Sequence, residues 1–456
     1  YCLAQHISVG YGVLILIGEL ISPFTSSGVH FINIILAMVS IIAFYKIMEL
    51  LFPHYSSLIL GFASAIYAFS PYVLGMAGII NLDNPGIYLF IILVYCYVKK
   101  YKIWEMFFSW AFVCTKEPHV IYYTFFVLGS AFLDAITRKK DVEKSYLCMY
   151  SPVVFWLLYY IAPGRNAWVS SKYLFNNSGV HTIGFTVENT VIKLKELLIL
   201  NFNWIFILAI IFCIMYKCRT CKIAPDNLNR VVFPTLFCFI GVLLFNSFYL
   251  DFPHPRYIAV GAECVVLLGI ISLLTIKKSD QISIIYLSII MLLMFGQSFF
   301  TMDPLTRISF SSLDYSDTGA GLVIMSGDRF NDSAIYNREY FYYNKTLEEA
   351  LRKTDYNNGD VLVFPEYENI SRAYMYEDRF LWNLNEKKIQ TKESAYTIPI
   401  QIASSEEELM NVERIIYLEP YCFPEDKNIL EGKQITQTLD VRYKTMIFTA
   451  KIVESE

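Results

Sequence analysis

Charged side chains are scarce in this chain. Asp, Glu, Lys and Arg make up 17% of the 456 residues, whereas an ordinary soluble domain carries about 25%. The shortage is confined to residues 1–300, because residues 303–456 have the composition of a soluble domain. The first part is therefore not an ordinary soluble domain, and the step in composition predicts a domain boundary between residues 302 and 303.

Several common motifs are also missing. The chain has no Gly-rich phosphate loop, no G-x-S-x-G and no internal repeat. Its one C-x-x-C, Cys218 to Cys221, has no second pair, and a structural zinc site needs about four ligands. The formal net charge of −4 gives no reason to expect a nucleic-acid partner. No Met or basic segment precedes the first apolar run, so we expect an upstream segment that this sequence lacks.

Apolar residues are abundant, at 55% of the chain. A helix needs about 20 mostly apolar residues to cross a bilayer. The candidate spans are 30–52, 56–79, 85–98, 103–115, 118–136, 146–163, 198–216, 231–250, 257–276 and 281–301. The sequence therefore predicts a polytopic α-helical membrane domain over residues 1–302, with about ten transmembrane helices.

The basic residues predict how these spans are oriented, because cytoplasmic loops hold most Lys and Arg. Four basic clusters are separated by two, two and two crossings, so all four fall on one side, which we expect to be cytoplasmic. They lie at 99–102, 138–140, 217–222 and 277–278. The loops around Asp83, Lys116 and Arg256, the outer loop 164–197 and all residues after 301 then lie on the opposite side.

Two further segments are predicted to lie at the membrane surface. Residues 6–21 are short for a span and contain Glu19, so we interpret 1–22 as an interfacial helix, with a membrane-spanning helix as the open alternative. The end of the outer loop, 189–200, has apolar residues at helical spacing and predicts a second interfacial helix.

Residues 303–456 favour a small α/β extracytoplasmic domain, because predicted strands alternate with predicted helices. The Asp303-Pro304 pair ends the last span. The predicted strands are 321–326, 360–364 and 414–418, the predicted helices are 346–352 and 404–410, and residues 434–453 favour an antiparallel pair.

Asp83 is the first candidate for chemistry, since it stands between two long uncharged segments. It could orient an acceptor hydroxyl or a basic partner. The alternative is an ordinary helix start, in which Asp83 or Asn84 caps the helix and Pro85 takes its first position.

Lys116, Glu117 and His119 lie between two apolar segments so short that the turn could be below the membrane surface. Charges at that depth are costly and indicate function. Lys116 could hold a phosphate as a point charge, or it could extend to water beside Glu117. Glu117 and His119 are the candidate ligands for a metal ion.

Arg256 follows the turn that contains His254 and opens a late span. Its guanidinium fork suits a pair of phosphate oxygens, and free N–H groups of a first helical turn also favour anions. A structural link to Glu263, two turns further on, is the alternative. His254 could equally be solvated.

In order and hydropathy, these loops resemble the GT-C superfamily of membrane glycosyltransferases, especially the protein O-mannosyltransferase and aminoarabinose-transferase type (glycosyltransferase family 39). That family has an acid after its third span, as in Asn81-Leu82-Asp83, a Thr-Lys pair, as in Thr115-Lys116, and an Arg-Tyr pair opening a late span, as in Arg256-Tyr257. It also has an interfacial helix before its second span and often a soluble extracytoplasmic domain. The likeness covers most of 1–300, although each motif has only two or three residues.

One family feature is missing. The principal catalytic acid of the family precedes the interfacial helix, and residues 1–6 contain no acid. The resemblance therefore implies that this acid lies upstream of Tyr1, with Asp83 in a supporting catalytic role. A divalent metal ion is the one cofactor that the resemblance leaves open.

The resemblance implies an inverting glycosyltransferase in the plasma membrane, with its C-terminal domain outside the cytoplasm. The donor would be a polyprenyl-phosphate-linked sugar, and the acceptor an envelope glycan, lipid or protein. The implied substrate-binding residues are Lys116, Arg256, Tyr257, Glu117 and His254. Two alternatives stay open: a transporter or flippase of lipid-linked glycans, and a non-catalytic membrane protein that binds envelope polymers.

Overall fold

The structure is a computed structural model of the chain, and its helices and strands carry most of the described residues. The described ranges are 9–23, 26–77, 84–116, 118–137, 145–161, 184–220, 226–248, 255–276, 279–299, 302–309, 349–350, 352–355, 360–363, 380–383, 388–391, 401–402, 413–419, 433–443 and 446–455.

The chain divides into two compact units. One contains Tyr1–Ile17 and Val29–Ile335, and the other contains Gly18–Gly28 and Tyr336–Glu456. The boundary expected from composition, between residues 302 and 303, stays a prediction.

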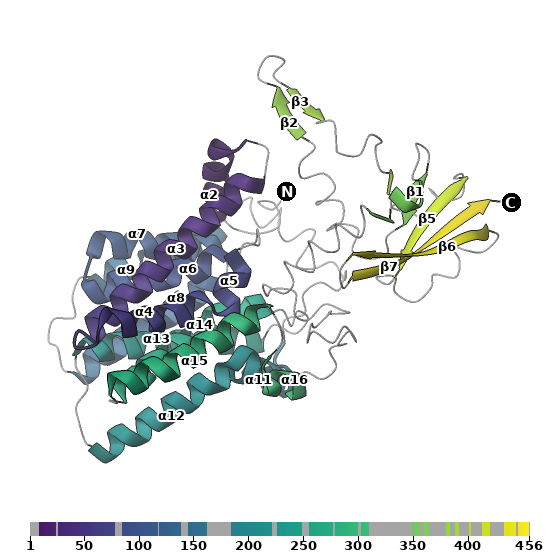
Figure 1. Cartoon of the computed structure of the whole chain (residues 1–456). Coiled ribbons are helices and arrows are strands. Elements are labelled where there is room, and N and C mark those ends of the chain that lie inside the picture. Colours follow the sequence, from purple (N-terminus) through teal and green to yellow (C-terminus); the bar gives the residue numbers. More distant parts are fainter. Residues whose placement is uncertain are drawn as a thin grey trace. The chain divides into compact units, whose positions relative to one another are not determined.

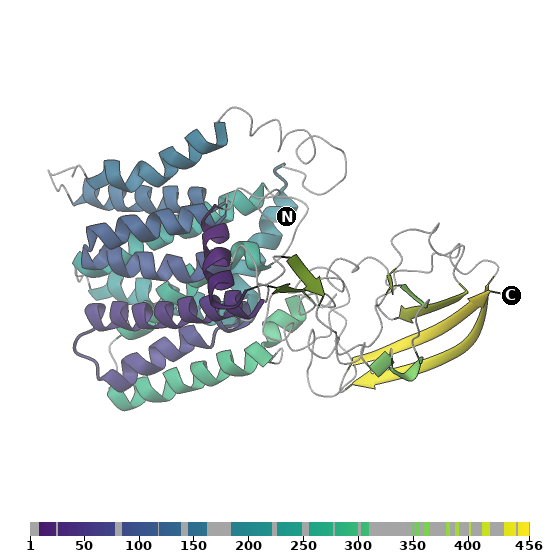
Figure 2. The ribbon, with the colours of Figure 1, turned by 90° about the horizontal axis from the view of Figure 1, so that it is seen from above.

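The first unit is built of helices that lie largely side by side (Figures 1 and 2), although the end of α2 and the start of α3, within Gly18–Gly28, count with the other unit. Their bounds are α2 Val9–Ile21, α3 Ser26–Leu51, α4 Ser57–Ala68, α5 Pro71–Ala77, α6 Asn84–Lys99, α7 Lys102–Thr115, α8 Pro118–Ile136, α9 Ser145–Ile161, α11 Val187–Ile199, η1 Leu200–Phe202, α12 Asn203–Thr220, α13 Asp226–Ser247, η2 Pro255–Ile258, α14 Ala259–Thr275, α15 Asp280–Phe299 and α16 Pro304–Ser309.

The described part of the chain is mostly helical, with a small C-terminal sheet. Among the described residues, five helices are long and apolar enough to cross a bilayer, or six if α4 and α5, which meet at 62°, form one broken span. Helices occupy every segment predicted as a span, but several, such as α6 and α14, are shorter than a full crossing. These apolar helices agree with the predicted membrane class, whereas the number of ten spans stays a prediction.

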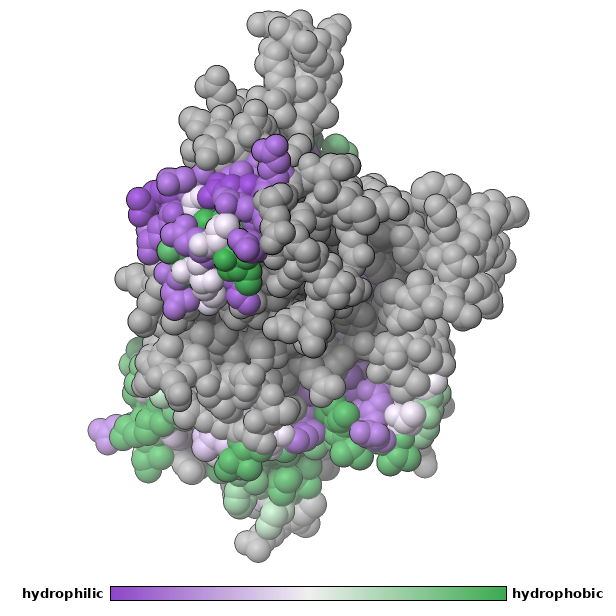
Figure 3. Space-filling view, turned by 90° about the vertical axis from the view of Figure 1, so that its right-hand side faces the viewer, coloured by the Kyte–Doolittle hydropathy of each residue, from purple (hydrophilic) through white to green (hydrophobic). Residues whose placement is uncertain are grey.

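The outer helices present apolar surface. On α3, Phe31, Ile35, Met38 and Ile42 are all exposed and recur at helical spacing. Figure 3 shows hydrophobic side chains gathered over the helices and mostly hydrophilic ones over the C-terminal sheet. Soluble proteins rarely expose contiguous apolar stripes of this kind, so lipid tails are their natural neighbours.

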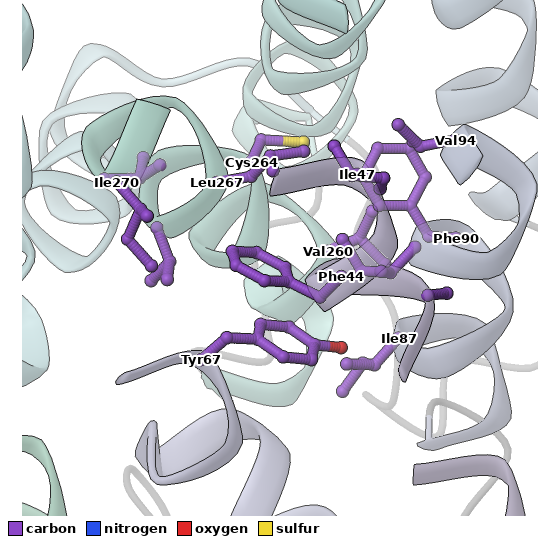
Figure 4. Close-up of a cluster of buried hydrophobic side chains, with 14 of the residues drawn as sticks. Phe44, Ile47, Tyr67, Ile87, Phe90, Val94, Val260, Cys264, Leu267 and Ile270 are labelled. Carbon is purple, nitrogen blue, oxygen red and sulfur yellow. The ribbon is translucent and has the colours of Figure 1, made fainter. Parts of the chain in front are cut away.

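Helix α14 forms the centre of the first unit. Every residue from Ala259 to Ser272 is buried, as expected for a helix that is apolar on all sides. Figure 4 shows its side chains meeting those of α3, α4 and α6, with the rings of Phe44 and Tyr67 stacked 4.5 Å apart. This packing fixes the start of α14, and with it the turn that contains Tyr257.

The segment from α11 to α12 is broken rather than continuous. By length and hydropathy, Val187–Lys217 counts as one candidate span of 31 residues. Its backbone is kinked at Asn201 and Phe202, whose φ angles of 57° and 64° are left-handed. The carboxylate of Asp303 accepts hydrogen bonds from the Phe202 N–H (2.8 Å) and the Trp204 indole (3.0 Å). Helix α11 is therefore a separate helix, and it contains most of the segment predicted to lie at the membrane surface.

The C-terminal unit contains a five-stranded sheet in the order β4-β1-β5-β7-β6 and a separate pair, β2 with β3. Strand β1 pairs in parallel with β4 and β5, whereas β7 pairs antiparallel with β5 and β6. The bounds are β1 Val361–Val363, β2 Phe380–Asn383, β3 Lys388–Thr391, β4 Gln401–Ile402, β5 Arg414–Glu419, β6 Lys433–Tyr443 and β7 Met446–Ser455.

Sequence patterns located part of this sheet correctly. The strands predicted at 360–364 and 414–418 correspond to β1 and β5, and the antiparallel pair predicted at 434–453 corresponds to β6 and β7. The predicted strand 321–326 and the predicted helix 404–410 lie outside the described residues, so the α/β class of this unit stays a prediction.

Candidate functional site

Two of the three predicted loops meet at one end of the helical unit. The Lys116 ammonium lies 4.0 Å from the centroid of the Tyr257 ring. Asp83, Glu117, His254 and the side chain of Arg256 lie outside the part of the chain that the structure describes.

Lys116 is held in a short break between two helices. It follows α7 with an extended backbone (φ −156°, ψ 150°), its carbonyl accepts the His119 N–H at 3.1 Å, and Pro118 begins α8. Pro suits a first helical position because that residue's N–H has no partner inside the helix. The Lys116 side chain is only 6% exposed.

The contact with Tyr257 stabilises this buried cation. A ring face attracts a cation by about 0.5–1 kcal/mol at an exposed site and about 2 kcal/mol where water is excluded. Because Lys116 is almost fully buried, we expect the higher part of this range.

Tyr257 is itself fixed by a polar network on its backbone carbonyl. That oxygen accepts hydrogen bonds from the Tyr122 hydroxyl (3.1 Å) and from Nδ2 of Asn246 (3.3 Å). Asn246 Nδ2 also donates to the Tyr122 hydroxyl at 3.0 Å, and Asn189 of α11 donates to the carbonyl of Asn246. The network joins α8, α11 and α13 to the turn, so the Tyr257 ring meets Lys116 in a defined place.

His119 occupies a tightly packed position beside Lys116. Its ring stacks on Phe112 at 4.6 Å, and Nδ1 lies 2.7 Å from Thr115 Oγ1 and 3.2 Å from the Phe112 carbonyl. A carbonyl only accepts, so these contacts favour a proton on Nδ1. The Cε1 side of the ring lies against Gly86 of α6, where an added Cβ would overlap it.

The Gly86 contact brings the third predicted loop to the same end of the unit. Gly86 is in the first turn of α6, two residues after Asn84, which donates to the Met76 carbonyl at 2.7 Å. The described flank of the Asp83 loop therefore packs against the Thr115–His119 segment, which in turn contacts Tyr257.

Two buried charged side chains near the site were not singled out from the sequence. Lys193 and Glu196 of α11 form an ion pair at 3.0 Å with both side chains almost fully buried. Their neighbour Leu197 packs against Gly261 of α14, close to the Tyr257 turn. Buried ion pairs tolerate little rearrangement because removal of either partner leaves an uncompensated charge. The pair marks the face of α11 that packs on the bundle.

The Glu263 carboxyl lies fully buried on α14, next to the Tyr67 hydroxyl of α4. The link to Arg256 considered from the sequence stays untested, since the Arg256 side chain is outside the described part.

Sequence reasoning did not find Tyr122, Asn189 or Asn246 as supporting residues. The signal available for Asn246 was an amide within an apolar segment, where a polar side chain needs a specific partner.

Metal ligation was also considered for this region. Within the described ranges no group of three or more His, Cys, Asp or Glu side chains is arranged to hold a metal ion. Since Glu117 is not described, its pairing with His119 stays a prediction.

Comparisons with known proteins give no relatives: no family model, curated protein or solved structure matches this chain.

Proposed function

We propose that the protein is an inverting glycosyltransferase that moves a sugar from a polyprenyl-phosphate-linked donor to an envelope glycan, lipid or protein acceptor. The observation that carries the proposal is the 4.0 Å contact between Lys116 and the Tyr257 ring. It joins two loops that the sequence resemblance assigns to the donor phosphate. The proposal places the protein in the plasma membrane with this end and the C-terminal unit outside the cytoplasm.

In the proposed reaction, the acceptor hydroxyl attacks the anomeric carbon opposite the phosphate. The bond from that carbon to the phosphate oxygen breaks, and polyprenyl phosphate leaves with the bonding electrons. The principal catalytic acid of the family, in its carboxylate form, would take the hydroxyl proton, and Asp83 would orient the acceptor or the lysine.

Lys116 and Arg256 would act mainly on the leaving group. Negative charge grows on the phosphate in the transition state, and fixed cations in a water-poor site stabilise it more strongly than water does. Tyr257 would hold the Lys116 ammonium in place, while Glu117 and His254 would contribute to substrate binding. The apolar helices around the site would accept the polyprenyl chain.

A direct test measures binding of polyprenyl phosphate, because this leaving group is shared by all donors of the class. We expect Lys116→Ala and Arg256→Ala each to weaken its binding to the full chain in detergent by tenfold or more, and to reduce transfer from a panel of polyprenyl-phosphate-linked sugars. Lys46→Ala is the matched control, because Lys46 is an exposed lysine of α3 paired with Glu49. If both site variants bind polyprenyl phosphate as the unmodified protein does, the phosphate assignment is wrong.

A further inference from the structure

A second cationic region lies at the opposite end of α7 from Lys116. Helix α7 runs from Lys102 to Thr115, and at 1.5 Å per residue its two ends are about 20 Å apart. Lys99, Lys100 and Lys102, at the turn between α6 and α7, are all exposed. The turn is therefore distinct from the proposed donor site.

An arginine from another helix joins these lysines. Nη2 of Arg230, from α13, lies 3.4 Å from the Tyr97 carbonyl, and the Lys100 N–H donates to the same oxygen at 3.1 Å. The Arg230 guanidinium also lies 5.0 Å from the Tyr97 ring. Its Nε is buried without a hydrogen-bonding partner among the described residues. Arg230 thus reaches the turn with part of its donor capacity unused.

The backbone of the turn is unusual for a lysine. Lys100 has a φ of 59°, and the Tyr101 N–H donates to the Cys96 carbonyl at 2.9 Å, which closes a Schellman-type helix end. Gly is the residue that normally occupies this left-handed position, because a Cβ is unfavourable there. Strained backbone of this kind is typical of binding sites, and here it carries a long cationic side chain.

Exposed aromatic side chains follow directly on α7. Trp104 and Phe107 are each 56% exposed, Tyr101 is 48% exposed, and the rings of Trp104 and Phe107 meet edge to face at 6.0 Å. Trp and Tyr gather at the level of lipid headgroups because their rings are apolar and their edges are polar. A lipid whose headgroup contacts these lysines would therefore have its acyl chains beside the aromatic rings.

Among the described residues, Glu105 and Asp134 lie within electrostatic reach of Tyr97, and the Lys46–Glu49 ion pair lies within reach of Tyr95. The ion pair adds no net charge, so three lysines and Arg230 outnumber the two remaining carboxylates. The described part of this region therefore has a net positive charge, which favours an anionic partner over a zwitterionic one.

We propose that the turn between α6 and α7 binds the phosphate of an anionic phospholipid. Lys99, Lys100 and Lys102 surround the headgroup, Arg230 supplies guanidinium donors, and the acyl chains lie along Trp104 and Phe107. A lysine near a charged membrane surface contributes about fivefold in affinity. The site does not depend on the proposed glycosyl transfer.

The test uses the full chain in neutral detergent, titrated with phosphatidylglycerol or phosphatidylcholine and followed by native mass spectrometry and thermal unfolding. We expect phosphatidylglycerol to bind more tightly and to raise the unfolding temperature more. Lys99→Gln and Lys102→Gln should each weaken phosphatidylglycerol binding about fivefold. Lys353→Gln, an exposed lysine of the C-terminal unit, should leave it unchanged.

Lys100→Gly distinguishes an effect on lipid binding from an effect on stability, because the two should change in opposite directions. Glycine relieves the left-handed backbone, so the lipid-free variant should unfold at a higher temperature, yet it should bind phosphatidylglycerol about fivefold more weakly. Equal affinity for the two lipids, or unchanged phosphatidylglycerol binding in all three lysine variants, overturns the proposal. An equal effect of inorganic phosphate also overturns it, because the acyl chains would then contribute nothing.

Discussion

The Lys116 ammonium rests over the Tyr257 ring, while the Tyr257 carbonyl is bound from behind by Tyr122 and Asn246. The ring and the carbonyl therefore have separate tasks: the ring contacts the cation, and the carbonyl fixes the turn. Because the two groups belong to one residue, a side-chain substitution can remove the first task and leave the second intact.

Replacement of the Tyr257 ring tests this division. Tyr257→Leu should lower the free energy of unfolding by about 2 kcal/mol, as the buried cation loses the ring face, and should increase the rate at which an amine-reactive reagent modifies Lys116. Tyr257→Phe keeps a ring face and should behave much like the unmodified protein. Mass spectrometry of modified Lys116 peptides gives the rates. Equal rates in the Leu and Phe variants would show that the ring does not protect the ammonium.

Removal of the Asn246 amide should loosen the turn. In Asn246→Leu the Tyr257 carbonyl loses one of its two donors, and Tyr122 loses the hydrogen bond to its hydroxyl. We expect a loss of about 1–3 kcal/mol in unfolding free energy, the cost of leaving buried polar groups without partners.

Thr235→Val is the matched control for Asn246, because it alters another buried polar side chain of α13. The Thr235 hydroxyl has no hydrogen-bonding partner among the described residues, so its loss should be neutral or slightly stabilising. Chemical unfolding followed by intrinsic fluorescence measures both variants. A larger loss for Thr235→Val than for Asn246→Leu would contradict the role given to the network.

Asp303 should have a large effect on stability although it is far along the chain from the segment it supports. Besides the Phe202 N–H and the Trp204 indole, it accepts from the Leu305 N–H and the Thr306 hydroxyl. Asp303→Ala leaves these donors without their acceptor and should cost about 3 kcal/mol or more.

Asp303→Asn provides a graded comparison, since an amide keeps one accepting oxygen in place of two. Its unfolding temperature should lie between those of Asp303→Ala and the unmodified protein. Trp204 fluorescence should shift in the Ala variant, because the indole N–H loses its partner. Unchanged fluorescence together with unchanged stability would refute the importance of this contact.

The sequence predicted the helices well because each depends on local hydropathy. The runs around Phe44 and Val260 are apolar over most of their length, and helices lie there. Asp303-Pro304 was correctly expected to end the last apolar segment, as α15 ends at Phe299 and α16 begins at Pro304.

The contacts of the site could not be predicted in the same way, because they join distant parts of the chain. Hydropathy places Lys116 and Tyr257 at ends of helices but does not determine which helix ends become neighbours. The hydrogen bonds of Asp303 depend on the left-handed backbone at Asn201 and Phe202. Asn adopts this conformation fairly often but Phe only rarely, so the sequence did not predict it for the pair. The roles of Asp83, Glu117, His254 and Arg256 stay predictions.

Two helical glycines give a matched test of how closely α6 approaches His119. A Cβ on Gly86 would lie 2.1 Å from His119 Cε1 and 2.7 Å from Nε2, whereas a Cβ on Gly61 of α4 would meet no atom within 4 Å. Gly61→Ala should therefore stabilise the protein by about 0.5–1 kcal/mol, the ordinary gain of Ala over Gly inside a helix.

Gly86→Ala should destabilise the protein, because the His119 ring is stacked on Phe112 and bonded at Nδ1 and cannot move without breaking these contacts. Overpacking of this kind costs about 1–3 kcal/mol. Gly86→Ala combined with His119→Ala should recover part of the loss, since the shorter side chain makes room for the added methyl group. Thermal unfolding of the two single variants and the double variant measures this coupling. A stabilising Gly86→Ala would mean that α6 does not pack on His119, and the flank of the Asp83 loop would then no longer belong with Lys116 and Tyr257.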